Sequence, residues 1–199
     1  MIIQPGVKIS CNGRVGTLGL LVKRKVEPEK TYLMCCWHIL DDENPAGTVI
    51  LPDHNNLVIA NYQRSESTAI KEMDVAIAEL APDHGLPMNN TTVDNARTIY
   101  QAAYWKNGVT LIKYGAATLS TQCQLVEQAG SIGNLMRGLK LAKLPGGDKK
   151  YCAHGDSGAV WCSSETGKAI GLHSKGFEGN LAAASPIIVI LGKLQLTIV

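Results

Sequence analysis

The segment Gly155-Asp156-Ser157-Gly158 places a serine between two glycines, directly ahead of the apolar run Ala159-Val160-Trp161. A nucleophilic serine needs such a tight turn, because its hydroxyl must project into a cleft and flanking glycines let a substrate carbonyl approach the backbone. The backbone N–H groups of Gly155 and Ser157 would then form an oxyanion hole. A plain β-turn also explains these four residues, since Gly, Asp and Ser all favour turns.

A serine hydroxyl is a weak nucleophile and needs a base and a group that orients the base. His38 stands where an apolar strand gives way to a helical turn, which favours a histidine facing a cleft. Asp74 opens the apolar segment 75–80, where an acid is costly unless it is paired. The alternatives are that His38 is a packed structural residue and that Asp74 is an exposed acid at a strand end. Together the three residues favour a nucleophilic serine site.

The elements that must position these residues are mostly β, because the dominant hydrophobic period is two and glycines interrupt short segments. We predict strands at residues 15–23, 31–36, 48–51, 57–62, 75–80, 98–104, 109–114, 117–126, 135–143, 158–162, 169–174 and 181–184. Evenly spaced short strands predict barrels or a sandwich. The polar, proline-containing segment 81–90 is the candidate linker, so His38 and Asp74 precede it and Ser157 follows it.

The C-terminus changes character at Ser185-Pro186. Serine is a good N-cap and proline suits the first helical position, so we predict a short helix over residues 187–196. The β-branched run from Ile187 to Ile190 favours a strand instead, and this alternative stays open.

The composition argues against several classes of function. Among the 199 residues 18% are charged, the net charge is +2, and no basic run exceeds residues 23–25, so we expect no nucleic-acid partner. The sequence contains no stretch of about 18 uncharged apolar residues, so no membrane-spanning helix is predicted. The N-terminus lacks the basic and apolar regions of a signal peptide. We therefore expect a cytoplasmic protein whose six cysteines are free thiols.

A zinc site is an alternative use of the cysteines and histidines. Its candidate ligands are Cys35, Cys36, His38, Cys152 and His154. No C-x-x-C pair or other usual zinc-ligand spacing occurs among them, so we expect no metal there.

The motifs resemble those of the chymotrypsin-like (trypsin-like) serine peptidase family, over nearly the whole chain. Residues 37–40 resemble its histidine motif, residues 74–77 its aspartate motif, and residues 155–158 match its serine motif. The chain order His, Asp, Ser is also that of this family. Three further segments resemble its intracellular, mostly prokaryotic branch, which also occurs in plants: Gly16-Thr17-Leu18-Gly19, residues 106–110 and residues 167–171.

The resemblance implies an all-β fold of two six-stranded antiparallel β-barrels with a short C-terminal helix. Residues 1–90 would form the barrel with His38 and Asp74, and residues 91–199 the barrel with Ser157 and the helix. It implies an endopeptidase in which Ser157 attacks the peptide carbonyl, His38 takes its proton and Asp74 orients the imidazole. A protein or peptide is then the substrate, no metal or organic cofactor is needed, and a regulatory protein partner is compatible with the sequence.

The sequence departs from the secreted family members at two points. Ile39 stands where those enzymes have a cysteine, so the usual disulfide beside the histidine is not expected. The Ile-Val-Gly-Gly activation sequence is missing, so we expect no newly freed N-terminus to pair with Asp156.

In this family the primary pocket is lined by residues just before the nucleophile and by the strand after it. The corresponding residues here are Tyr151, His154, His173, Ser174, Lys175 and Gly176. Tyr151 occupies the position of the acid in a trypsin, so a basic substrate side chain would lack a counter-charge. Residues 171–173 resemble a strand of viral main proteases and glutamyl endopeptidases, whose histidine donates a hydrogen bond to a Gln or Glu side chain. We expect that preference here; the alternative is a packed His173 and a small or apolar substrate residue.

The main alternative function is a non-catalytic, protease-like module that holds a peptide strand along residues 174–176. It requires a distorted site, because all three residues of the proposed triad are present.

Overall fold

A computed structural model of the chain describes residues 1–94, 96–128, 130–132, 135–136, 138–146, 151–177 and 180–199. Most of the first half forms one curved sheet in the strand order β17-β3-β4-β8-β6-β5-β1-β2, with β7 paired to β8. Its strands are β1 (Lys8–Cys11), β2 (Arg14–Thr17), β3 (Leu20–Arg24), β4 (Glu27–Cys35), β5 (Ala46–Leu51), β6 (Leu57–Gln63), β7 (Ala69–Ile70), β8 (Val75–Leu80) and β17 (Leu196–Ile198).

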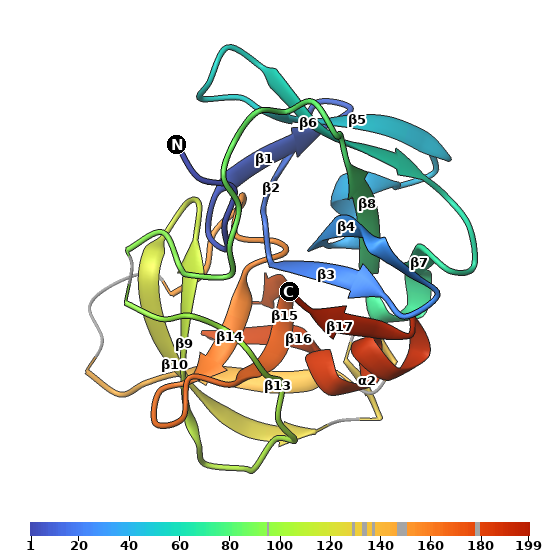
Figure 1. Cartoon of the computed structure of the whole chain (residues 1–199). Coiled ribbons are helices and arrows are strands. Elements are labelled where there is room, and N and C mark those ends of the chain that lie inside the picture. Colours follow the sequence, from blue (N-terminus) through green and yellow to red (C-terminus); the bar gives the residue numbers. More distant parts are fainter. Residues whose placement is uncertain (95, 129, 133–134, 137, 147–150, 178–179) are drawn as a thin grey trace.

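The second half forms a closed barrel in the order β10-β13-β16-β15-β14-β9, which lies below the first sheet in Figure 1. Its strands are β9 (Thr110–Gly115), β10 (Leu119–Gln128), β13 (Leu139–Lys143), β14 (Val160–Ser163), β15 (Ala169–Phe177) and β16 (Leu181–Pro186). A separate pair is formed by β11 (Ser131–Ile132) and β12 (Leu135–Met136). The helices are α1 (Trp37–Leu40), η1 (Lys71–Met73, 3-10) and α2 (Ile187–Lys193).

The predicted fold class, all-β with two barrel units and a short C-terminal helix, is confirmed. The second unit is a closed six-stranded barrel, whereas strand pairing in the first runs as an open path from β17 to β2. Strand β8 shows why the units associate: Ala76 and Ala78 face the interior of the first unit, while Val75 and Ile77 belong to a core shared with the second. A strand buried on both faces loses the polar alternation of a half-exposed strand.

Most predicted strands are present, three predicted segments differ from the structure, and β1, β7, β11 and β17 were not predicted. The segment 98–104 is not a strand, so that prediction was wrong: its pairing is limited to isolated bridges at Thr98 and Ala102. The segment 15–23 is divided between β2 and β3, because the backbone of Leu18 and Gly19 bonds instead to Val7 and Met34. The prediction for 135–143 includes residue 137, which lies outside the described residues.

The C-terminal helix is present but shorter than predicted. Pro186, not Ser185, is its N-cap, and the Ser185 hydroxyl donates to the backbone carbonyl of Met73. The chain leaves the helix after Lys193 and adds β17 to the edge of β3 (Figure 1). The last residues therefore tie the C-terminal half to the N-terminal sheet.

None of the six cysteines forms a disulfide, as predicted, and only Cys152 is partly exposed. Within the described residues, the helices are too short or too polar to cross a bilayer.

Candidate active site

The residues of the predicted triad come together between the two units. His38 lies in α1, immediately after β4, and Asp74 ends η1 in a left-handed conformation at φ 48°. Asp74 Oδ1 accepts from the backbone N–H of His38 at 3.0 Å, and the two carboxylate oxygens lie 2.9 and 2.8 Å from His38 Nδ1. These contacts fix both the position and the tilt of the imidazole.

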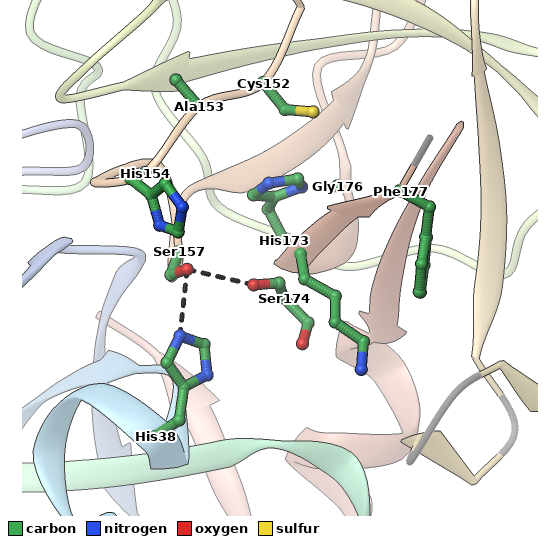
Figure 2. A pocket seen from close by; sticks show the side chains of 10 residues that line it. His38, Cys152, Ala153, His154, Ser157, His173, Ser174, Gly176 and Phe177 are labelled. Carbon is green, nitrogen blue, oxygen red and sulfur yellow. Dashed lines mark hydrogen bonds between the residues drawn. The ribbon is translucent and has the colours of Figure 1, made fainter. Parts of the chain in front are cut away.

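Ser157 lies on the opposite side of the imidazole. Its Oγ is 3.1 Å from His38 Nε2 and 3.0 Å from the carbonyl oxygen of Ser174, to which it donates (Figure 2). With Nδ1–H directed at Asp74, Nε2 is the ring nitrogen free to accept the serine proton. The single hydroxyl proton therefore has two alternative acceptors.

Ser174 has a second contact that sequence reasoning did not find. Its hydroxyl donates to Asp74 Oδ2, so a residue predicted to bind substrate also bonds the buried carboxylate. Asp74 is 8% exposed, and hydrogen bonds from His38 and Ser174 offset the cost of burying its charge. No local signal could reveal this contact, because Ser174 lies 100 residues from Asp74 in the chain.

The turn before β14 depends on its two glycines. Gly155 and Gly158 have φ of +99° and +96°, where side chains are strained. Within the described part of the chain, no protein acceptor is recorded for the backbone N–H of Gly155 or Ser157. Two unpaired donors beside a serine hydroxyl are what a developing oxyanion requires.

Gly158→Ala is expected to destabilise the protein more than Gly13→Ala. A Cβ on Gly158 would lie 2.3 Å from the Thr17 carbonyl oxygen and 2.4 Å from Cys35 Sγ. We expect a loss of about 3 kcal/mol or more, because overpacking adds to left-handed strain. Gly13 has a similar φ of +80° but open space around it, so strain alone should cost about 1–2 kcal/mol. Equal urea midpoints for the two variants would contradict this account.

A buried ion pair also stabilises the turn that carries Ser157. Asp156 and Lys113 are both fully buried, with Nζ 2.9 Å from Asp156 Oδ2. The same carboxylate accepts from the Thr118 hydroxyl at 2.7 Å and from the backbone N–H of Ala117, Thr118 and Ala153. Burial raises the pKa of a carboxyl, but Lys113 and the hydrogen bonds from Thr118 outweigh it and hold the pKa of Asp156 below its usual range.

Lys113 was not predicted from the sequence. Burial lowers the pKa of Lys113, while Asp156 opposes that change. An internal lysine in the apolar strand β9 is the available signal, since lysine is almost never fully buried unless it is paired.

A pocket of about 430 Å³ opens beside Ser157, between β15 and the segment before the turn (Figure 2). Its lining residues are His38, Cys152, Ala153, His154, Ser157, His173, Ser174, Lys175, Gly176 and Phe177. Five of the six predicted pocket residues are among them. Tyr151 is not: it is buried in the second barrel, where its hydroxyl donates to the Leu141 carbonyl. Phe177 was not predicted.

A second pocket, of about 400 Å³, lies on the other side of the same serine. Its lining residues are Arg14, Val15, His38, Ile39, Asp42, His154, Gly155 and Ser157. Because both pockets share His38, His154 and Ser157, an extended chain could pass the serine with side chains on either side.

Several solved protein structures are similar to this one. Neither protein-family models nor curated protein sequences match the chain. A serine protease specific for glutamic acid, which uses a histidine triad in substrate binding, matches at TM-score 0.77 and 19% identity, over 99% of this chain and 100% of that one. Nocardiopsis protease matches at 0.76 and 14%, and Cellulomonas bogoriensis chymotrypsin at 0.74 and 14%, each over 100% of this chain and 99% of the other. The chain has a chymotrypsin-like fold.

In this chymotrypsin-like fold, His173 lies on β15 and is 1% exposed. Its Nδ1 accepts from the indole N–H of Trp161 at 3.3 Å. Burial, together with the charge of Lys113, lowers the pKa of His173 to about 3. His173 is therefore neutral at physiological pH.

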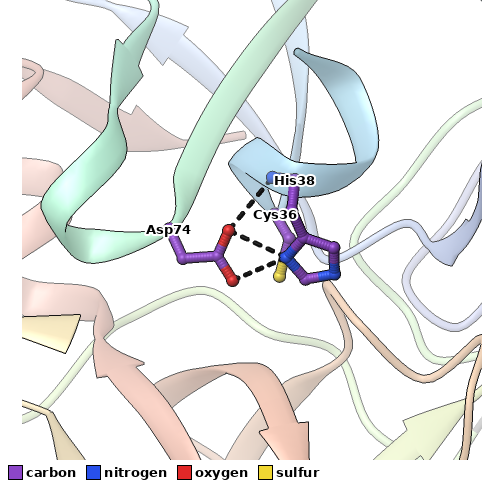
Figure 3. A group of neighbouring side chains, drawn as sticks. All are labelled: Cys36, His38 and Asp74. Carbon is purple, nitrogen blue, oxygen red and sulfur yellow. Dashed lines mark hydrogen bonds and ion pairs between the residues drawn. The ribbon is translucent and has the colours of Figure 1, made fainter. Parts of the chain in front are cut away.

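The residues that could hold a metal ion coincide with part of this site. Cys36 Sγ, His38 Nδ1 and an Asp74 oxygen lie within 4.8 Å of one another (Figure 3). These atoms already form hydrogen bonds: the Cys36 thiol donates to the His173 carbonyl at 3.1 Å, and His38 Nδ1 bonds Asp74. Burial also raises the pKa of the Cys36 thiol well above its usual value, so the thiolate that a metal requires is costly. Cys35, Cys152 and His154 do not join this group.

Proposed function

We propose that the protein is a serine endopeptidase with Ser157 as nucleophile, His38 as general base and Asp74 as the orienting acid. The observation that carries the proposal is the continuous series of contacts from Ser157 Oγ through the His38 ring to Asp74, all at hydrogen-bond distance. The chymotrypsin-like fold of the protease neighbours supports it. Either pocket beside Ser157 would hold one side of the substrate chain.

In the proposed reaction, Ser157 Oγ forms a bond to the substrate carbonyl carbon while its proton passes to His38 Nε2. The N–H groups of Gly155 and Ser157 stabilise the resulting oxyanion. His38 then returns the proton to the leaving amine as the C–N bond breaks, and water releases the acyl-enzyme by the same steps. The Ser174 carbonyl competes with His38 Nε2 for the Ser157 proton. If a substrate N–H donates to that carbonyl, the Ser157 hydroxyl is expected to donate to His38 instead.

A fluorophosphonate probe tests this proposal. We expect the probe to add covalently to Ser157, because only an activated serine is nucleophilic enough to displace fluoride. Intact-mass and peptide mass spectrometry would locate the adduct, with protein denatured before exposure as the control. The non-catalytic, peptide-holding module predicts no adduct on the folded protein. The undistorted contacts of His38 favour the enzyme over that alternative.

We further propose that the pocket beside β15 accepts a Glu or Gln side chain before the cleaved bond. His173 lines this pocket with its Nδ1 occupied by Trp161, which leaves Nε2 as the nitrogen that can donate to a substrate oxygen. A structural neighbour that is specific for glutamic acid supports the proposal. A peptide library tests it, and cleavage mainly after Arg, Lys, Ala or Leu would contradict it.

The location and partners follow as proposals of the same kind. Six cysteines without a disulfide suit a reducing compartment, so we propose a cytoplasmic protein of the intracellular branch of this fold family. Protein or peptide substrates are its proposed partners, and the proposal leaves room for a regulatory protein partner.

A further inference from the structure

We propose that Trp161 is a positioning residue that makes this pocket select glutamine over glutamate. The inference rests on the proposed endopeptidase function and deepens it. Trp161 lies on β14 beside β15, is fully buried, and contacts His173 edge-to-face with ring centroids 6.0 Å apart. It does not line the pocket, so it acts through the histidine.

The contact sets the tautomer of His173. An indole N–H is a donor only, so the nitrogen that it meets, Nδ1, must be an unprotonated acceptor. A neutral imidazole with Nδ1 unprotonated carries its hydrogen on Nε2. Protonating the ring would put an N–H on Nδ1, directly against the N–H of Trp161. The geometry therefore opposes a charged His173.

The positive charge of a nearby lysine also favours the neutral form of His173. Lys113 lies 5.2 Å from the centroid of the Trp161 ring, and its positive charge disfavours protonation of His173. The charged and titratable groups that act on His173 are Lys113, Asp156, His38 and Asp74. The two acids partly offset the effect of Lys113, but burial dominates and His173 stays neutral.

A neutral donor distinguishes glutamine from glutamate through desolvation. The side-chain carbonyl of Gln can accept from Nε2 with no charge to bury, whereas a Glu carboxylate entering the pocket gives up water and meets no buried cation in return. Lys175 is the one lysine or arginine among the described lining residues. Lys175 itself is partly exposed, and its ammonium lies 5.3 Å from the ring centroid of the exposed Phe177, so water screens its charge.

The experiment compares peptides that differ only in Gln or Glu before the cleaved bond. For the wild type we expect kcat/KM to favour Gln by about tenfold or more, with a constant ratio between about pH 6 and pH 8, where a Glu side chain stays ionised. In Trp161→Phe, which keeps a ring but removes the N–H, His173 stays buried and neutral but can place its hydrogen on either nitrogen, so Nε2 donates less often and the ratio should fall at every pH in this range. Trp105→Phe is the matched control, since Trp105 packs on the same core cluster, and it should keep the wild-type ratio.

A second measurement does not depend on activity. Two-bond ¹⁵N–¹H correlation spectra show which nitrogen of His173 carries the proton, with the signal assigned by its loss in His173→Leu. We expect Nε2–H only in the wild type and both neutral tautomers in Trp161→Phe. A protonated Nδ1 in the wild type would overturn the inference even if Trp161→Phe does not fold.

The outcomes separate the two proposals. A chain that the fluorophosphonate labels but that prefers Glu, or ignores the difference, would overturn the role of Trp161 alone. An unchanged Gln-to-Glu ratio in a folded Trp161→Phe variant would do the same. A chain that cleaves no peptide and takes no label would overturn the endopeptidase function, and the glutamine preference with it.

Discussion

Replacing Ser157 with alanine is expected to lower kcat for peptide cleavage by roughly a million-fold, because the members of a nucleophile–base pair act as a unit. The variant keeps the glycines of the turn and removes a hydroxyl whose partners, within the described residues, are the Ser174 carbonyl and His38 Nε2. Its thermal midpoint should therefore stay close to that of the wild type. Peptide hydrolysis followed by mass spectrometry, with unfolding followed by circular dichroism, measures both quantities.

His38→Ala should be about as damaging as Ser157→Ala, and combining the two should add little. Ser120→Ala, an exposed serine on β10, is the matched control and should keep full activity. Full cleavage activity in the Ser157→Ala variant would contradict the assignment of Ser157 as the nucleophile. Loss of cleavage accompanied by unfolding would instead assign Ser157 a structural role.

Lys113→Met should destabilise the protein by about 3–5 kcal/mol, because it leaves the buried carboxylate of Asp156 without its cation. Activity should fall as well, since the same carboxylate holds the backbone of Ala153 ahead of the turn. Because the pKa of Asp156 is lowered in the folded protein, this contribution is present above about pH 4 and is lost as the pH falls further. Urea unfolding at neutral and acidic pH measures it.

The control is Lys140→Met, which breaks an exposed ion pair with Glu127 in the same barrel and should cost about 1 kcal/mol or less. Lys113→Met combined with Asp156→Asn should recover part of the lost stability, because the buried site is then neutral. If Lys113→Met and Lys140→Met unfold at the same urea concentration, the buried pair does not support the turn as described.

The sequence alone predicted the fold class, most of the strands and the residues that meet around Ser157. Those predictions rest on local signals: an alternating hydrophobic period, glycines flanking a serine, and an acid and a histidine placed at strand ends. The helix after Pro186 was predicted by capping preferences in spite of its β-branched residues, yet its cap differs because Ser185 bonds Met73 from a distant element.

Tertiary structure decided what depends on contacts between distant segments. The Ser174 hydroxyl on Asp74, Lys113 beneath Asp156, and Trp161 against His173 join residues whose spacing carries no periodic signal. Tyr151 illustrates the same limit, since its position before the serine indicated the pocket but its side chain turns into the barrel core. Sequence spacing fixes which residues lie near the turn, whereas the direction of each side chain depends on the packing of both units around it.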